Sequence, residues 1–331
     1  MKKIFAFAVA AFAAFSLTAQ SNYKMRVVKT DGTEIFYNTS EIDFVDFKYA
    51  EDEPAQPEEP KEVTVFLAGD NVNQDGPCRV TRLENTGPDG GCILAYPENM
   101  SEDPYVKHGV IIWGPGGGEK PSAYLGAINR LASHGFVVLA LSSSPGDGNS
   151  ASAAINWLEE RNNMTEGPLA GKLIMDRVGC SGHSMGGLES EQALLKDPRV
   201  YTAILNNSGD LGHSAMSQIK SGKPIAIVYG EKGMEAPNAE ADYGNSGVTT
   251  PACLIKMTGG PTNTGEGGYG HGSGPWDGIA ATVAWMRWHI GGENHKDEFT
   301  TPNGQYVSGP IIGKQGYWQG KYKNWENWKE D

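Results

Sequence analysis

The chain has 331 residues, and its 27 Lys and Arg against 40 Asp and Glu give a formal net charge of −13 at pH 7. An acidic balance of this size argues against nucleic acid or an anionic membrane as a partner, because either would favour a basic patch. The length is sufficient for one sizeable domain with short additions.

The first 20 residues have the pattern of a secretory signal peptide. Lys2 and Lys3 precede an apolar run at 4–17, which ends in the small and polar residues 18–20. The run is too short to span a bilayer, and no later stretch approaches ~18 unbroken apolar residues. We therefore expect an exported protein, periplasmic or extracellular, with no membrane anchor.

Residues 21–48 are predicted to form a small β-hairpin. Their hydrophobicity alternates on both sides of Asp31-Gly32, a dipeptide that favours a type I′ turn. Residues 50–62 are acidic, rich in proline and free of large apolar side chains, so 49–62 is predicted to be an extended linker. The hairpin would then be an appendage of a main domain at 63–331.

In the main domain, apolar runs typical of strands alternate with helical patterns. Strands are expected at 93–96, 110–113, 136–141, 178–180, 203–205, 225–229 and 253–257, and helices at 121–134, 151–161, 185–196 and 278–290. This alternation predicts an α/β fold whose mostly parallel central sheet carries helices on both faces. The aromatic tail with Trp318, Trp325 and Trp328 is expected to pack across this body.

The four cysteines are Cys78, Cys92, Cys180 and Cys253. They form no C-x-x-C pair and there is no histidine cluster at metal-ligand spacing, so we expect neither a metal site nor a cofactor. Cys78 and Cys92 flank a turn-rich region and could lie on neighbouring strands, so we predict a disulfide between them, which export would permit. The other two lie in apolar strands and are expected to be buried thiols.

The sequence Gly182-His-Ser-Met-Gly-Gly187 is the strongest functional signal in the chain. It stands between a predicted strand and a predicted helix, where a serine held between glycines forms a tight turn that exposes its hydroxyl. The N–H of Met185, the next residue, would be available to an oxyanion. The motif indicates that Ser184 is a nucleophile.

The order of motifs over residues 74–290 resembles that of the α/β-hydrolase enzymes of the cutinase and polyester-hydrolase type. The resemblance is carried by Gly76-Pro77, Gly90-Gly91, Tyr96-Pro97, Gly114-Pro-Gly-Gly-Gly118, Leu131-Ala-Ser-His-Gly-Phe-Val-Val138 and Gly182–Gly187. It implies the α/β-hydrolase fold and a secreted serine carboxylic-ester hydrolase that acts through an acyl-serine intermediate. The implied substrates are small aliphatic, polyester or plant-polysaccharide esters.

The resemblance also implies roles for individual residues. The glycine loop after the third core strand would supply an oxyanion donor from Gly116 or Gly117, with Met185 as the second donor. His271 follows the last core strand and would take the proton of Ser184. His183 and His213 are candidates for the substrate pocket.

The acid of the triad is where the chain departs from the family pattern, because Gly233 stands where an Asp is expected. Glu235 could replace it, since a Glu can orient an imidazole equally well, and Glu231, Asp242 and Asp210 are alternatives.

Gly233 and the hairpin also motivate a second hypothesis, a non-catalytic binding or surface protein on a hydrolase scaffold. The sequence names neither the acyl and alcohol groups nor the oligomeric state.

Overall fold

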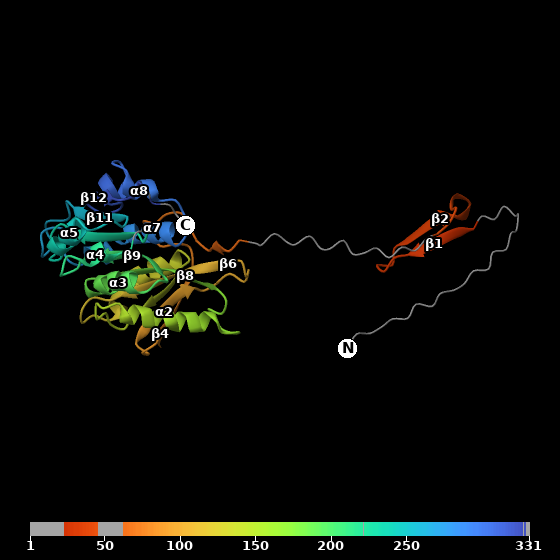
Figure 1. The fold of residues 1–331 in the computed structure, drawn as a ribbon, viewed down its shortest axis with the longest axis horizontal. Helices are drawn as coiled ribbons and strands as arrows, with labels where there is room; N and C mark the ends of the chain where they lie inside the picture. Colours follow the sequence, from red (N-terminus) through yellow and green to blue (C-terminus); the bar gives the residue numbers. More distant parts are fainter. Residues whose placement is uncertain (1–22, 46–61, 221, 327, 329–331) are drawn as a thin grey trace. The chain divides into compact units, whose positions relative to one another are not determined.

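The computed structural model describes residues 23–45, 62–220, 222–326 and 328. The chain divides into two compact units, residues 1–60 and 61–331 (Figure 1). The predicted signal peptide, and all of the predicted linker except Glu62, lie outside the described residues.

The described part of the smaller unit is an antiparallel hairpin of β1 (Lys24–Val28) and β2 (Glu34–Asn38), followed by η1 (Thr39–Glu41). Val28 pairs with Glu34, so residues 29–33 form the connection. The expected two-residue type I′ turn is therefore wrong. The longer loop is held by a hydrogen bond from the Thr33 N–H to the Asp31 carboxylate (2.8 Å), and Gly32 takes the left-handed φ of 84° that favours glycine.

The larger unit is built on one mixed sheet. Its strands are β3 (Thr64–Val65), β4 (Val80–Thr86), β5 (Cys92–Pro97), β6 (Val106–Gly114), β7 (Val137–Ala140), β8 (Leu173–His183), β9 (Val200–Asn206), β10 (Ile225–Gly230), β11 (Ala252–Thr258) and β12 (Tyr317–Lys323). Their order is β12-β11-β10-β9-β8-β6-β7-β5-β4, with β3 beside β6. The strands from β11 to β7 are parallel, and antiparallel pairs close both edges.

Helices cover both faces of this sheet (Figure 1). They are η2 (Pro121–Tyr124), α1 (Leu125–Ser133), α2 (Asn149–Asn162), α3 (Met185–Lys196), α4 (Ala215–Gln218), α5 (Ala236–Gly244), α6 (Ser273–Trp276), α7 (Ile279–His289), α8 (Lys296–Thr300) and α9 (Gln305–Ser308).

Alternate residues of β6 show why two layers are needed. Ile111 and Trp113 join the core formed with α1 and α7, whereas Val110 and Ile112 join the core formed with α2 and α3. Successive side chains of a strand point to opposite faces, so an entirely apolar strand needs a helix layer on each side. The predicted α/β-hydrolase architecture is confirmed. No helix in the described ranges is both long enough and apolar enough to cross a membrane.

The C-terminal aromatic segment forms part of this body. Strand β12 pairs antiparallel with β11, and both Trp318 and Trp325 are buried in the core beside α7. The expectation that the tail packs across the domain is confirmed for these two residues.

The predicted disulfide between Cys78 and Cys92 is wrong, because all four cysteines are free thiols in the structure. Strands β4 and β5 are indeed neighbours, but their register pairs Cys92 with Thr86 at one end and Val80 with Pro97 at the other. Cys78 precedes Val80, so the 7 residues of β4 separate the two thiols. A strand rises about 3.3 Å per residue, so the length of β4 far exceeds the roughly 7 Å between Cα atoms that a disulfide tolerates.

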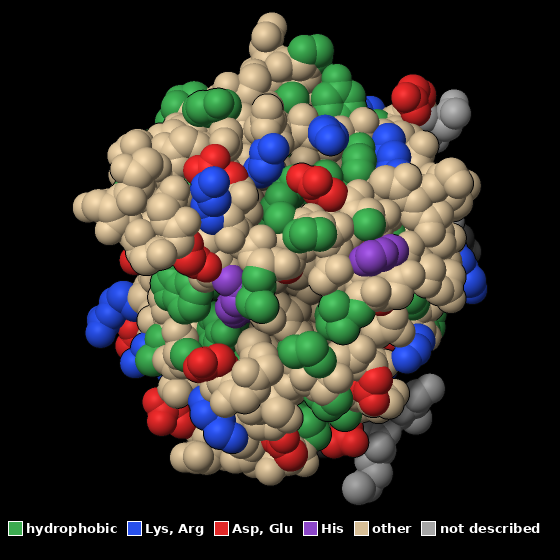
Figure 2. Space-filling model, turned by 90° about the vertical axis from the view of Figure 1, so that its left-hand side faces the viewer, with side chains coloured by type: hydrophobic (Ala, Val, Ile, Leu, Met, Phe, Trp, Pro, Cys, Tyr) green, Lys and Arg blue, Asp and Glu red, His purple; other side chains and the backbone are tan. Residues whose placement is uncertain are grey.

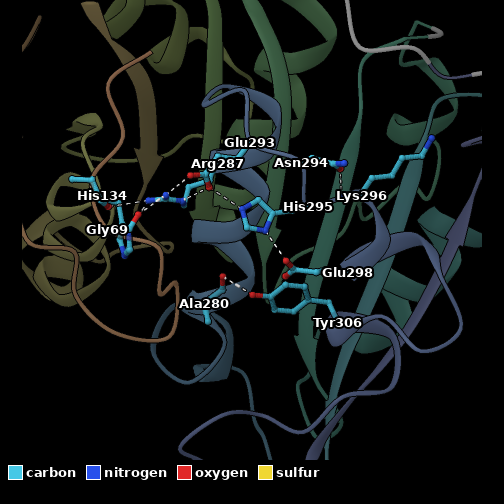
Figure 3. Close-up of polar contacts among 11 residues, drawn as sticks. Gly69, His134, Ala280, Arg287, Glu293, Asn294, His295, Lys296, Glu298 and Tyr306 are labelled. Atoms are coloured by element: carbon cyan, nitrogen blue, oxygen red, sulfur yellow. Dashed lines mark hydrogen bonds and ion pairs between the residues drawn. The ribbon is translucent and has the colours of Figure 1, made fainter. Parts of the chain in front are cut away.

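A buried arginine ties the start of the larger unit to α7 (Figure 3). The guanidinium of Arg287 is 1% exposed and donates to the carbonyls of Ala68 (3.0 Å) and Gly69 (2.6 Å) and to the Glu293 carboxylate (2.6 Å). It also meets Nδ1 of His134 at 3.0 Å. The guanidinium is therefore paired with a carboxylate and hydrogen-bonded to carbonyls. These partners offset the desolvation cost of burying its charge.

Candidate active site

Ser184 occupies a strained turn between β8 and α3. Its φ is 53°, a left-handed value that is uncommon outside glycine, and Ser208 Oγ donates to its carbonyl at 2.7 Å. The turn requires glycine at Gly186, where a Cβ would lie 1.9 Å from the carbonyl oxygen of Gly114. Strain of this kind is concentrated at active sites, and this strand-turn-helix geometry is that of a nucleophile elbow.

His271 and Glu235 form a direct pair. Nδ1 of His271 lies 2.6 Å from Oε2 of Glu235, whose side chain is 7% exposed. The contact with the Glu235 carboxylate raises the pKa of His271 above its ordinary value, in spite of an opposing effect of burial. Because Nδ1 faces the carboxylate, Nε2 is the ring nitrogen left to exchange a proton with a substrate or a nucleophile.

The glycine at the expected acid position belongs to the same arrangement. A Cβ on Gly233 would lie 2.1 Å from Oε1 of Glu235. A side chain at position 233 would therefore collide with the carboxylate of Glu235 as it is placed. Glycine at position 233 therefore leaves the space that the carboxylate of Glu235 occupies.

The other three candidate acids are held elsewhere. Glu231 accepts hydrogen bonds from Thr258 Oγ1 (2.6 Å) and the Gly260 N–H (3.1 Å). Asp210 accepts from the backbone N–H groups that begin α4. Asp242 is buried, and burial raises its pKa. Of the four carboxylates, the structure brings only Glu235 to His271.

Asn207 is a functional candidate that the sequence analysis did not single out. It directly follows β9, and its Nδ2 donates to Glu235 Oε1 (2.6 Å) and to the Gly270 carbonyl (3.1 Å). Its Oδ1 accepts from the Gly274 N–H. One amide therefore fixes the acid and the histidine loop on both sides of His271. A polar residue at the carboxyl end of a core strand is the sequence signal that could have identified it.

The two glycines proposed as oxyanion donors are not equivalent. The Gly116 N–H donates to the Tyr124 hydroxyl at 3.0 Å, so the prediction of Gly116 as a donor is wrong. Gly117 lies against Met185, since a Cβ on it would meet Met185 Cγ at 3.0 Å. Within the described residues, neither the Gly117 nor the Met185 N–H donates to another group outside regular secondary structure, and the first N–H groups of a helix such as α3 have no intrahelical acceptor.

His183 and His213 do not form the substrate pocket that was expected of them. His183 is 7% exposed and its ring nitrogens contact the Tyr124 hydroxyl (2.8 Å) and the His271 carbonyl (2.9 Å). The ring of His213 meets the side chain of Asn238 at 3.0 Å. Of these two residues, Asn238 lines the pocket.

Ser184, Met185, Glu235 and His271 line one cavity of about 160 Å³. Its walls also include the apolar side chains Leu188, Leu211 and Met234.

Leu211 and Met234 are 70% and 77% exposed, so apolar groups stand at the mouth of the cavity. Figure 2 shows histidine side chains among hydrophobic ones on the face that the left-hand side of Figure 1 presents, where α4 and α5 lie.

Half-exposed Trp276 stacks on Tyr124, with ring centroids 5.5 Å apart, and the sequence analysis also missed this residue. A second cavity, of about 300 Å³, is lined by Leu83, Trp157 and Leu169 and contains none of the groups that line the first.

Among the described residues, no group of three or more His, Cys, Asp or Glu is placed to hold a metal ion. The residues that line the cavity bring together the hydroxyl of Ser184, the imidazole–carboxylate pair of His271 and Glu235, and the main chain of Met185.

Comparison with known proteins agrees with this geometry. Residues 72–311 match the model of a family described as PETase, PET hydrolase-like. A bis(hydroxyethyl) terephthalate hydrolase of Streptomyces coelicolor (strain ATCC BAA-471 / A3(2) / M145) is 32% identical over 133 residues, which cover 38% of this chain and 39% of that protein. The chain thus spans about two fifths of the length of this curated relative.

Proposed function

The chain belongs to the PET hydrolase-like family, and we propose that it hydrolyses carboxylic esters through an acyl-serine intermediate on Ser184. The observation that carries the proposal is the 2.6 Å contact between His271 and Glu235 in the cavity that Ser184 lines. A histidine oriented by a buried carboxylate beside a serine is the arrangement that activates a hydroxyl nucleophile.

In the proposed reaction, Nε2 of His271 takes the proton of Ser184 as its Oγ attacks the ester carbonyl. The N–H groups of Gly117 and Met185 stabilise the oxyanion, and such donors contribute about 2.7–4 kcal/mol each. The tetrahedral intermediate expels the alcohol, which receives the proton from His271. A water molecule, activated by the same imidazole, then releases the acid and frees Ser184.

The substrates we propose are short esters of aromatic or aliphatic acids, of which bis(hydroxyethyl) terephthalate is the test case. The support is the name of the relative, the family description and the small cavity with apolar Leu211 and Met234 at its mouth. Flat apolar acyl groups would bury surface against these side chains at about 25 cal/mol per Å².

A panel of chromogenic esters with acyl chains of increasing length, together with bis(hydroxyethyl) terephthalate, tests the proposal. We expect turnover of short acyl esters and of the terephthalate diester, and loss of it in His271→Ala. Absence of turnover on every ester by the unmodified protein would favour the alternative of a binding protein on a hydrolase scaffold.

We also propose that the protein is exported through the signal peptide at residues 1–20. The support is the pair Lys2-Lys3 followed by the apolar run at 4–17. Expression with the natural N-terminus and mass measurement of the protein in the periplasm and medium test it, and an unprocessed protein confined to the cytoplasm would contradict it.

A further inference from the structure

A continuous chain of hydrogen bonds runs behind the proposed catalytic residues. The Gly116 N–H donates to the Tyr124 hydroxyl (3.0 Å), that hydroxyl lies 2.8 Å from Nδ1 of His183, and Nε2 of His183 lies 2.9 Å from the His271 carbonyl oxygen. This hydrogen-bond chain begins at Gly116, in the loop after β6, and ends at the carbonyl of His271, in the loop before α6. The hydrogen bonds therefore connect the glycine loop at 114–118 to the loop that carries His271 (the histidine loop, 259–274), through His183, the residue that precedes Ser184.

The groups at the two ends of this hydrogen-bond chain fix the direction of the bonds next to them. A backbone N–H can only donate, so the Tyr124 oxygen accepts from Gly116 and its single hydrogen is free to go to His183. A carbonyl can only accept, so Nε2 of His183 carries the hydrogen that bonds to the His271 oxygen. In a neutral ring Nδ1 then accepts from Tyr124, so a neutral His183 is the Nε2–H tautomer.

The surroundings of His183 favour the neutral ring. The pKa of His183 lies below its ordinary value because burial and the charge of a protonated His271 lower it, and together they outweigh the hydrogen bond to the His271 carbonyl and the Glu235 and Glu119 carboxylates, which raise it. The two imidazole centroids are 4.7 Å apart, and the edge of Trp276 closes another side at 5.8 Å. A neutral His183 lets His271 accept a proton without meeting a second positive charge.

The histidine loop needs such an external support. Eight of the residues 259–274 are glycine, and glycine loses the most conformational freedom when it is ordered. On the main chain of His271 itself, the N–H donates to Glu266 Oε1 at 3.2 Å, and among the described residues His183 is the partner of the carbonyl. The His183 contact is the one that reaches this backbone from the elbow.

We propose that His183 is a positioning residue that holds the His271 carbonyl and so sets the imidazole of His271 against Glu235 and Ser184. The inference rests on the proposed function. It assigns His183 no contact with substrate, because its side chain is turned away from the cavity toward Tyr124 and the His271 backbone.

Four variants test the proposal by steady-state kinetics across pH. His183→Leu removes both contacts, and Tyr124→Phe removes only the hydroxyl in the middle of the chain. His183→Gln keeps a side-chain N–H for the His271 carbonyl. His108→Leu is the matched control, because His108 is also buried and also contacts a backbone carbonyl, that of Gly135 at 2.7 Å, but lies in β6 away from the cavity.

We expect kcat of His183→Leu to fall by up to about 10²-fold with little change in KM, since a misplaced catalytic group costs rate and not binding. The acid limb of its pH–kcat profile, where activity rises as His271 loses its proton, should also move to lower pH. The reason is that a looser contact with Glu235 no longer raises the pKa of His271 as far. His183→Gln should recover most of kcat and the original limb. Tyr124→Phe should show a smaller loss in the same direction, and it reports on the chain even if His183→Leu does not fold.

Equal loss of kcat in His183→Leu and His108→Leu, with unmoved acid limbs, would show a merely structural role and overturn the proposal. So would full activity of both His183→Leu and Tyr124→Phe. An inactive Ser184→Ala in the same series separates this failure from failure of the proposed function. Nitrogen-15 NMR of the histidines is a readout without substrate: the proposal requires the neutral Nε2–H tautomer of His183 at pH 7, and the other tautomer would contradict it.

Discussion

Glu235 and His271 contact each other at 2.6 Å even though they are 36 residues apart and the acid stands two positions beyond the place that the family pattern assigns to it. The contact is possible because Gly233 leaves the space that the Glu235 carboxylate occupies. Asn207 holds the other carboxylate oxygen at 2.6 Å, so the acid cannot swing away without losing a second hydrogen bond.

Glu235→Gln should lower kcat by up to about 10⁴-fold with little change in KM, because it keeps the shape of the side chain and removes the charge that stabilises the imidazolium. Glu231→Gln is the matched control, since Glu231 is anchored by Thr258 and Gly260. Steady-state kinetics on a chromogenic ester measure both. Equal losses in the two variants would contradict the assignment of the acid.

The pH profile should carry the signature of the same pair. Glu235 raises the pKa of His271 above 6.5, and the neutral imidazole is the form that accepts a proton, so activity should rise with pH through a limb that lies above 6.5. In Glu235→Gln the residual activity should show this limb at lower pH. A limb that stays in place in the variant would show that Glu235 does not set the pKa of the catalytic base.

The sequence was sufficient to predict the elbow, the histidine and the helix-covered sheet because each depends on local order along the chain. The glycines around Ser184 and the place of His271 after the last parallel strand follow from chain order alone. The choice among Glu235, Glu231 and Asp210 depends instead on side-chain directions in loops. Those directions are fixed by partners such as Asn207 and Thr258, which are distant in sequence.

The errors have the same physical origin. Gly116 and Gly117 are neighbours in sequence, and only the position of the Tyr124 hydroxyl shows that the first N–H is already used. Cys78 and Cys92 lie at adjacent strands, as expected, but the register of the pair decides whether thiols meet. Register depends on the turn and on the packed face, and spacing along the sequence does not report it.

A thiol titration should find four free cysteines in the denatured, unreduced protein, and the count should fall to three in Cys78→Ser. In the native protein Cys78, which is half-buried, should react first. Burial raises the pKa of Cys92 to about 12, and Cys180 and Cys253 are fully enclosed, so these three should react only on unfolding. A count of two in the denatured protein would restore the disulfide.

His295 should make folding stability depend on pH. Burial lowers its pKa, but contacts with Glu298 (2.8 Å) and Glu293 (3.0 Å) outweigh this and raise the pKa above 6.5 (Figure 3). A group whose pKa is raised by folding stabilises the protein fully below the unfolded value and loses that contribution as pH rises through the folded value.

The measurement is urea unfolding of the wild type and His295→Gln over a pH series. The difference in free energy of unfolding should be largest below pH 6.5 and shrink as pH rises. Glu298→Gln is the partner control and should reduce this pH dependence. A difference that grows with pH would contradict the sign derived from the two carboxylate contacts.

Reaction with a fluorophosphonate, followed by peptide mass mapping, shows directly whether Ser184 is the nucleophile, because such reagents form a stable bond with an activated serine in place of the acyl group. We expect one equivalent of label on Ser184 and a parallel loss of ester hydrolysis. Ser184→Ala should show neither label nor turnover, and Ser208→Ala should still be labelled at Ser184. Label on another serine, or a Ser184→Ala variant that hydrolyses esters at the wild-type kcat, would contradict it.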